Sequence, residues 1–361
     1  MRTQAVGILA AVAVMACSAV AQADEPVAGN GPWSLRMAEG LVQRYPKGTM
    51  FEQRRPTDEP KWSYSVALVV RAIGEVGLEK NKPALVQYAR DYADAFVNAD
   101  GVIDPKKYTP AGYRLDDVAP GKLLLMLSQN TKDGRYLKAA DELVEQFKKQ
   151  PRNSDGGFWH KQIYPRQMWA DGIYMGCPFL AEYAYLSNRE SFYDEAATQI
   201  LLFANHALDA RTGLVWHAYD DAKVQKWADK QTGLSPNFWG RAVGWYAAGI
   251  VETLDYLPAK HPQRGAIIKV LQELAAGIEK VQDKKSGVWW QVLDKPEAEG
   301  NYLEASASSM FCYVLAKGAR LGYLDEHYAA VAQRGYAGVL KEFVRNDPQN
   351  GGLMLINTCS V

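Results

Sequence analysis

Two short stretches of the sequence place carboxylates just before an expected helix. Asp116 and Asp117 stand in YRLDDVAPG, and Asp171 stands in QMWADGIYMG. Each could be a simple helix cap, because a carboxylate at this position accepts hydrogen bonds from free backbone N–H groups. Asp171 also lies beside Trp169 and an apolar run, where burial would raise its pKa. A carboxyl group with a pKa near neutrality can donate a proton, so Asp171 is also a candidate general acid.

Proximity between the two acids could shift their pKa values further. If the fold brings Asp116 and Asp171 together, each negative charge is expected to raise the pKa of the other. The sequence alone leaves the capping and the catalytic interpretations open for both.

Three other stretches carry residue types that suit a binding site. His217 lies in GLVWHAYD, with a structural role and a pocket role equally open. In SPNFWGRAVGWY, Arg241 could bind a carboxylate through its forked N–H groups, or stack on the aromatic rings of Trp239 and Trp245 at a helix start. The small residues of YLEASASSM favour close packing at a helix start, with a pocket wall as a second possibility.

Helices must position these residues, because apolar side chains recur at helical spacing along most of the chain. A first helix is expected at about 32–45, and a helical pair at 64–78 and 83–97. Further helical hairpins are expected at 121–149, 173–208, 241–283 and 305–344. No stretch alternates with a period of two for long enough to predict an extensive sheet.

A similar loop follows each helical pair, which indicates an internal repeat. The loops begin at a glycine followed by apolar residues, at Gly101, Gly157, Gly213, Gly287 and Gly352. Counting the first helix with a partner from the end of the chain gives about six hairpins. An open solenoid usually needs polar capping units, and none is recognisable here. The repeat therefore favours an all-α, closed (α/α)6 barrel whose loops line a pocket at one rim.

Composition narrows the classes of ligand. The chain has 361 residues, equal numbers of basic and acidic residues, and 48% hydrophobic residues. This balance gives no reason to expect a nucleic-acid partner. The chain contains 10 Trp and 20 Tyr. Flat aromatic faces are common in carbohydrate sites, although most of these rings are expected to belong to the core. No Cys/His/carboxylate spacing predicts a metal, and no cofactor is expected.

The N-terminus predicts export. An apolar stretch at 5–20 precedes Ala21-Gln22-Ala23, which is typical of a signal peptide and its cleavage site. The stretch is short for a membrane span. Residues 1–23 are therefore expected to be a signal peptide and 24–361 a single catalytic domain, periplasmic or secreted. Lipidation at Cys17 is the less favoured alternative. Cys177, Cys312 and Cys359 form no disulfide framework and are expected to be buried.

Taken together, the motifs resemble a known family. WADGIYMGCPFLAEYA, GLVWHAYD, SPNFWGRAVGWY and YLEASASSMFCYVLAKGARLGYL are similar to motifs of the unsaturated rhamnogalacturonyl hydrolases of glycoside hydrolase family 105. The resemblance runs from about residue 35 to the end of the chain. It implies an (α/α)6 barrel, in agreement with the repeat.

The resemblance also assigns roles to residues. It implies that Asp171 is the general acid/base and Asp116 the second catalytic aspartate, with Asp117 more simply a cap. Substrate binding is implied for His217 and for Trp239 and Arg241 of the Trp-Gly-Arg motif. Three further positions match the pocket of the family: Lys161, Trp169 and Trp245.

The implied reaction is hydration of the C4=C5 double bond of a 4,5-unsaturated galacturonyl residue at the end of an oligosaccharide. An unsaturated glucuronyl hydrolase acting on fragments of glycosaminoglycans or ulvan, an inverting glycosidase on the same barrel, and a non-catalytic glycan-binding barrel remain alternatives. The family pattern continues beyond Cys359-Ser360-Val361 into a glycine-rich stretch, so a domain ending here could lack part of the pocket rim. The oligomeric state is not predicted.

Overall fold

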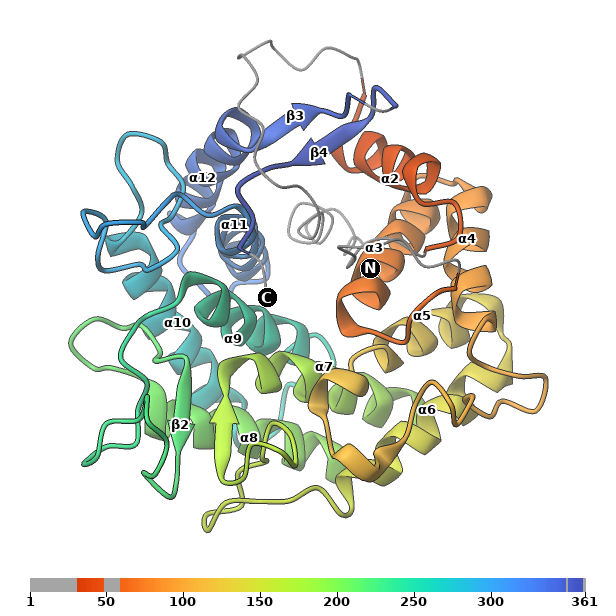
Figure 1. The fold of residues 1–361 in the computed structure, drawn as a ribbon, viewed down its shortest axis with the longest axis horizontal. Helices are drawn as coiled ribbons and strands as arrows, with labels where there is room; N and C mark the ends of the chain where they lie inside the picture. Colours follow the sequence, from red (N-terminus) through yellow and green to blue (C-terminus); the bar gives the residue numbers. More distant parts are fainter. Residues whose placement is uncertain (1–30, 49–58, 349, 360–361) are drawn as a thin grey trace.

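Helical hairpins follow one another around a ring (Figure 1). The computed structural model describes residues 31–48, 59–348 and 350–359. The helices are α2 (Trp33–Arg44), α3 (Tyr64–Glu79), α4 (Pro83–Asp94), α5 (Gly121–Thr131), α6 (Gly134–Phe147), α7 (Ala170–Ser187), α8 (Ser191–Ala207), α9 (Gly240–Thr253), α10 (Arg264–Lys280), α11 (Ala305–Arg320) and α12 (Tyr328–Glu342). Two 3-10 turns, η1 (Pro110–Gly112) and η2 (Leu115–Asp117), precede α5. The strands are β1 (Gln167–Trp169), β2 (Ala218–Asp220), β3 (Val344–Asn346) and β4 (Leu353–Leu355).

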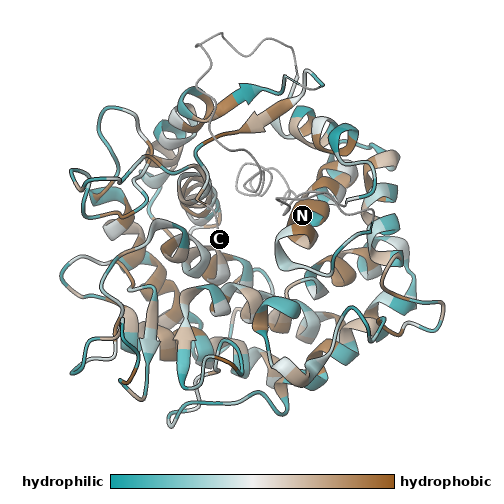
Figure 2. Ribbon diagram, viewed as in Figure 1, coloured by the Kyte–Doolittle hydropathy of each residue, from teal (hydrophilic) through white to brown (hydrophobic). Residues whose placement is uncertain are grey.

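Burial separates the helices into two layers. Every residue of α9 is buried, whereas α10 buries one stripe, formed by Ile267, Leu271, Leu274, Ala275, Gly277 and Ile278. The helices α3, α5, α7, α9 and α11 form the inner layer, and α4, α6, α8, α10 and α12 cover them, with α2 beside α4 (Figure 1). Figure 2 shows hydrophobic residues along the helices and hydrophilic residues on many peripheral loops. The predicted all-α (α/α)6 barrel is confirmed.

The inner helices all begin at the same rim, because each hairpin runs from an inner helix to an outer one. Neighbouring inner helices pack together from α3 through α5, α7 and α9 to α11. Helix N-termini carry partial positive charge from unpaired N–H groups. This rim therefore offers a favourable environment for an anionic ligand.

The two ends of the described chain meet and close the outer layer. The Arg44 Nη1 of α2 lies 2.6 Å from Asp347 Oδ2, which is buried beside β3. The Asn350 Nδ2 donates to the Gly40 carbonyl at 3.1 Å. A β-carbon on Gly40 would lie 3.2 Å from the Gly352 Cα, so the backbones of α2 and the β3–β4 turn are in contact.

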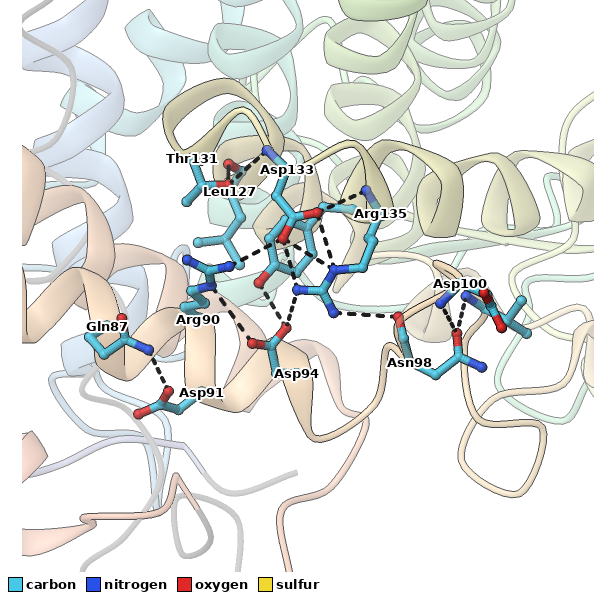
Figure 3. A network of polar contacts seen from close by, with 12 residues as sticks. Gln87, Arg90, Asp91, Asp94, Asn98, Asp100, Leu127, Thr131, Asp133 and Arg135 are labelled. Atoms are coloured by element: carbon cyan, nitrogen blue, oxygen red, sulfur yellow. Dashed lines mark hydrogen bonds and ion pairs between the residues drawn. The ribbon is translucent and has the colours of Figure 1, made fainter.

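The repeated loops share one turn that is anchored on the next outer helix. In the first of them, the Asn98 side chain accepts hydrogen bonds from the backbone N–H groups of Asp100 and Val102. Figure 3 shows this turn beside Arg135 of α6, which also contacts Asp94 and Asp133. The same figure shows how these charges join α4 to α6.

Glycine is needed in these turns for two reasons. Gly101, Gly213 and Gly287 have φ angles of 72°, 76° and 79°, and a β-carbon on each would come within 2.8 Å of a carbonyl oxygen of α6, α10 or α12. The predicted alignment was wrong by one residue in two repeats. Gly156 and Gly351, not Gly157 and Gly352, occupy the left-handed position there, because each is the first residue of a Gly-Gly pair.

Other predictions have mixed outcomes. The cysteines at 177, 312 and 359 are buried and form no disulfide with one another, as predicted. The predicted signal peptide and Cys17 lie outside the described residues, so export remains a prediction. Among the residues that the structure describes, no helix has the length and apolar character needed to cross a membrane.

Candidate active site

A two-stranded ladder brings Asp171 and His217 together. β1 pairs with β2 in antiparallel register, with Trp169 opposite Ala218. The Ala170 N–H extends the ladder by donating to the His217 carbonyl at 3.0 Å. The Asp171 Oδ2 then lies 3.1 Å from the His217 Nε2. Two residues that are 46 positions apart in the sequence thus form one acid–imidazole pair.

Asp171 does not cap its helix, so the capping interpretation is wrong. α7 begins at Ala170 and its N-cap residue is Trp169, which makes no side-chain capping bond. Asp171 stands inside the first turn instead. The helix dipole favours a negative charge there. Its side chain instead forms a hydrogen bond with His217, a titratable residue.

The electrostatic environment of Asp171 differs from the predicted one. Burial raises the pKa of its carboxyl group, but the hydrogen bond from His217 and the positive charges of His217, His160 and Arg241 outweigh it. The pKa of Asp171 therefore lies below its ordinary value, and the expectation that its surroundings would raise it is wrong. Its neighbours favour the carboxylate form.

Asp116 occupies a second, more closely neutralised position. It lies buried in η2, with its Oδ2 2.6 Å from the Lys161 Nζ and its Oδ1 3.3 Å from the His160 Nε2. Burial raises the pKa of Asp116, but His160 and Lys161 lower it well below its usual range. The net pKa shift of both Asp116 and Asp171 is therefore downward, opposite to the predicted direction, because neighbouring basic residues outweigh burial at each carboxylate.

The role predicted for Asp117 is also wrong. It lies within η2 and its Oδ2 is 3.4 Å from the Arg114 Nε, while the N-cap residue of α5 is Pro120. The sequence places adjacent aspartates here, but the 3-10 turn directs only Asp116 to the buried His160 and the half-buried Lys161.

His160 connects the two carboxylates and was not predicted as a site residue. Its ring contacts Asp116, and its charge also lowers the pKa of Asp171. Gly172 makes room for it, since a β-carbon there would lie 2.9 Å from the His160 Nδ1. That nitrogen is buried and has no hydrogen-bond partner among the described residues. The available sequence signal was the repeated loop GFWH, which places His160 where GLVWH places His217.

Aromatic rings surround the Asp171–His217 pair. Trp169 meets the His217 ring edge to face with centroids 4.8 Å apart, and Trp239 lies 4.7 Å from the same ring. Trp169 also stacks with Tyr164 at 5.3 Å and contacts Trp227 at 6.4 Å. Trp169 and Trp239 were predicted for the site. Tyr164 and Trp227 were not, because neither lies in a recognised motif.

Arg241 is held by the last described residues of the chain. It is buried, its guanidinium carbon lies 4.5 Å from the Trp239 ring centroid, and its Nη1 donates to the Cys359 carbonyl at 2.5 Å. Glu304, the N-cap of α11, accepts a hydrogen bond from the Cys359 N–H at 2.9 Å. The stretch predicted as small-residue packing thus also anchors the C-terminal segment beside Arg241.

Trp245 lies deeper than its predicted binding role requires. It is buried on α9 and packs on Tyr174 of α7, with ring centroids 4.5 Å apart. The Tyr174 hydroxyl contacts Lys122 and Glu252, which form a buried ion pair. Trp245 therefore packs between α9 and α7, and its role in substrate binding stays a prediction.

The chemistry of the described site is that of proton transfer and anion binding. No group of three or more His, Cys, Asp or Glu side chains in the described ranges is arranged to hold a metal ion. Asp116 stands beside the Lys161 ammonium group, and Asp171 stands beside the His217 imidazole. Such a site can bind an anionic sugar between aromatic rings and move a proton at Asp171.

Comparisons with known proteins identify the family. The sequence profile of Glycosyl Hydrolase Family 88 matches residues 33–361. A family 105 glycoside hydrolase from C. acetobutylicum is 37% identical in sequence, and the superposition covers 91% of this chain and 88% of that one with a TM-score of 0.85.

Two named enzymes are more distant. The unsaturated rhamnogalacturonyl hydrolase YesR of Bacillus subtilis is 29% identical over 63% of this chain and 62% of its own length. An unsaturated 3S-rhamnoglycuronyl hydrolase of Formosa agariphila is 29% identical over 44% of this chain and 42% of its own. The match along nearly the whole barrel shows that the chain belongs to the family 88 and 105 glycoside hydrolases, and specifically to family 105.

Proposed function

We propose that the protein removes a 4,5-unsaturated galacturonyl residue from the non-reducing end of rhamnogalacturonan oligosaccharides made by lyases. The carrying observation is the 3.1 Å hydrogen bond between Asp171 and His217, enclosed by the rings of Trp169 and Trp239. This geometry suits an acid/base that must reach one face of a flat, unsaturated sugar ring. The similarity to YesR supports the choice of substrate.

The proposed reaction hydrates the double bond. Protonated Asp171 gives its proton to C4, the π electrons form the new C4–H bond, and positive charge develops at C5 and the ring oxygen. Water then adds to C5 and returns a proton to the Asp171 carboxylate. The resulting hemiketal opens and the remaining saccharide leaves. A single acid/base suffices, unlike the paired carboxylates of ordinary glycosidases.

Substrate binding would supply the protonated state of Asp171. In the ligand-free site, the charges of His217, His160 and Arg241 lower its pKa. A uronate carboxylate beside these cations would offset their charge and raise the pKa, because a nearby anion favours the neutral acid. The substrate would thereby prepare its own general acid.

The other residues would bind and position. Arg241 would attract the uronate carboxylate, and Trp169 and Trp239 would contact the sugar ring. His217 would hold Asp171 and a hydroxyl group or the attacking water. Asp116 would keep His160 and Lys161 in place from its buried position, while Trp245 would hold α9 against α7.

A second candidate substrate has specific support. The similarity to the Formosa agariphila enzyme, an unsaturated 3S-rhamnoglycuronyl hydrolase, favours an unsaturated glycuronyl end beside a rhamnose. Incubation with an unsaturated rhamnogalacturonan disaccharide and an unsaturated glucuronyl-rhamnose disaccharide separates the two. The ultraviolet absorbance of the double bond should fall faster with the first. A faster fall in absorbance with the glucuronyl-rhamnose disaccharide would make it the preferred substrate. No fall with either disaccharide would refute both proposed substrates.

A further inference from the structure

The strand ladder of the active site leads outward to two loops. These mouth loops comprise residues 161–166, which precede β1, and residues 221–234, which follow β2. The Asp221 N–H donates to the Arg166 carbonyl at 2.9 Å and ties the loops together. Arg166 lies just outside β1, three positions before Trp169, and turns the chain with a left-handed φ of 62°.

Apolar side chains are unusually exposed on these loops. Ile163 is 72% exposed and Val224 is 68% exposed, the two highest values among the large hydrophobic residues of the described chain. Behind them, Tyr164 and Trp227 contact Trp169, which contacts His217. An apolar and aromatic surface is therefore continuous with the active site, and sugars stack on such surfaces through their C–H faces.

The acids of the longer mouth loop are used internally. Asp220 at its start is fully buried and accepts hydrogen bonds from three backbone N–H groups of the loop. Asp229 accepts from the Gln231 and Thr232 N–H groups. Asp221 is bound by Ser154. These bonds give the loop a fixed shape and occupy its carboxylates.

Two cations remain directed to solvent. Arg166 and Lys226 are exposed and have no ion-pair partner among the residues that the structure describes. By contrast, Lys223 and Lys230 donate to the loop carbonyls of Gln231 and Gln225. Positive charge beside an apolar surface is complementary to an acidic sugar.

We propose that the mouth loops form a distal subsite, which binds a second uronate-bearing sugar beyond the bond that is cleaved. The proposal rests on the function proposed above and extends it from the terminal sugar to the chain behind it. Arg166 and Lys226 would attract the second carboxylate, while Ile163 and Val224 would contact the intervening ring. Longer acidic oligosaccharides would then be better substrates than the disaccharide.

The test compares an unsaturated rhamnogalacturonan disaccharide with the tetrasaccharide, which carries a second uronate. The wild-type protein should show a higher kcat/KM for the tetrasaccharide. The double variant Arg166→Gln/Lys226→Gln should lose about threefold to tenfold of that preference, since exposed ion pairs each contribute modestly. Its kcat/KM for the disaccharide should be unchanged. The variant Ile163→Ser/Val224→Ser should lose preference in the same way.

A matched control removes the same charge elsewhere. Lys260→Gln/Arg320→Gln changes two exposed cations at the opposite rim, where inner helices end, and should keep the preference. Equal kcat/KM for both substrates in the wild type, or a preference unaltered in the mouth-loop variants, would overturn the distal subsite.

If the wild type fails to consume the disaccharide, the proposed function fails instead. The distal subsite is then tested by the ratio of tetrasaccharide to disaccharide Kd in the Asp171→Asn variant.

Discussion

At the scale of single residues, function depends on which basic side chains lie beside the carboxylates of Asp116 and Asp171. Asp116 and Asp171 were recognised from the sequence as the two acids, but their partners were not. His160 reaches Asp116 only because Gly172, in the first turn of α7, leaves space for its ring. A pKa set by residues on other loops cannot be read from neighbours in the sequence, and this explains why the predicted shifts had the wrong sign.

The stability contribution of Asp116 should depend on pH. Its pKa is lowered in the folded protein, so its stabilisation is present above its unfolded pKa and is lost as pH falls through the folded value. Asp116→Asn should therefore lower the free energy of unfolding by about 2–4 kcal/mol at neutral pH, because it leaves the half-buried Lys161 ammonium group without its anionic partner. The difference from wild type should shrink below about pH 4. Urea unfolding at several pH values measures it.

The adjacent aspartate provides the control. Burial, the largest effect, and the negative charge of Asp116 raise the pKa of Asp117, and Arg114 only partly opposes them. Asp117→Asn should consequently cost little stability at neutral pH. A loss at Asp117 equal to that at Asp116, or a difference at Asp116 that does not change with pH, would contradict this account.

At the scale of elements, the sequence predicted the hairpins well and their starting points less well. Hydrophobic periodicity placed the helices near their observed positions, since burial of one helix face determines both the apolar pattern and where the helix lies. The start of α7 was missed by three residues, at 173 instead of Ala170. It is fixed by the Ala170 bond to the His217 carbonyl, a tertiary contact that leaves no local pattern.

The repeated turns make a prediction at this scale. Gly213→Ala places a β-carbon at a φ of 76° and 2.6 Å from the Glu273 carbonyl oxygen of α10. It should lower the free energy of unfolding by about 2–4 kcal/mol, from backbone strain and displacement of the helix. Gly265→Ala in α10 is the control, because a β-carbon there meets nothing within 4 Å. It should be neutral or stabilising by about 0.5–1 kcal/mol. Similar losses in both variants, measured by urea unfolding, would contradict the prediction.

At the scale of the whole molecule, closure of the ring depends on segments far apart in the sequence. The repeat suggested a barrel but not how the ends meet. The structure brings Arg44 and Asp347, separated by 303 positions, within 2.6 Å. Such contacts cannot be inferred from hydrophobic periodicity, because both partners are charged residues and do not take part in the apolar pattern.

Weakening this contact should loosen the ends of the barrel. Asp347 is 2% exposed, so Asp347→Asn should lower the free energy of unfolding by about 1–3 kcal/mol through loss of a partly buried ion pair. Hydrogen exchange should accelerate in α2 and β4 and stay unchanged in α8. Glu195→Gln, which disrupts the exposed ion pair with Arg152, should leave hydrogen exchange in α2 and β4 unchanged. Unaltered exchange in α2 of the Asp347 variant would show that other contacts close the ring.

The central claim is that Asp171 moves the proton that starts the reaction. The most direct measurement is kcat/KM of Asp171→Asn on the unsaturated rhamnogalacturonan disaccharide, with the melting temperature recorded alongside. The account predicts a protein that melts like the wild type and loses about 10²–10⁴-fold in rate, as expected for removal of a general acid/base. A folded variant that keeps more than about a tenth of the wild-type rate would contradict it, since an amide cannot replace the acid.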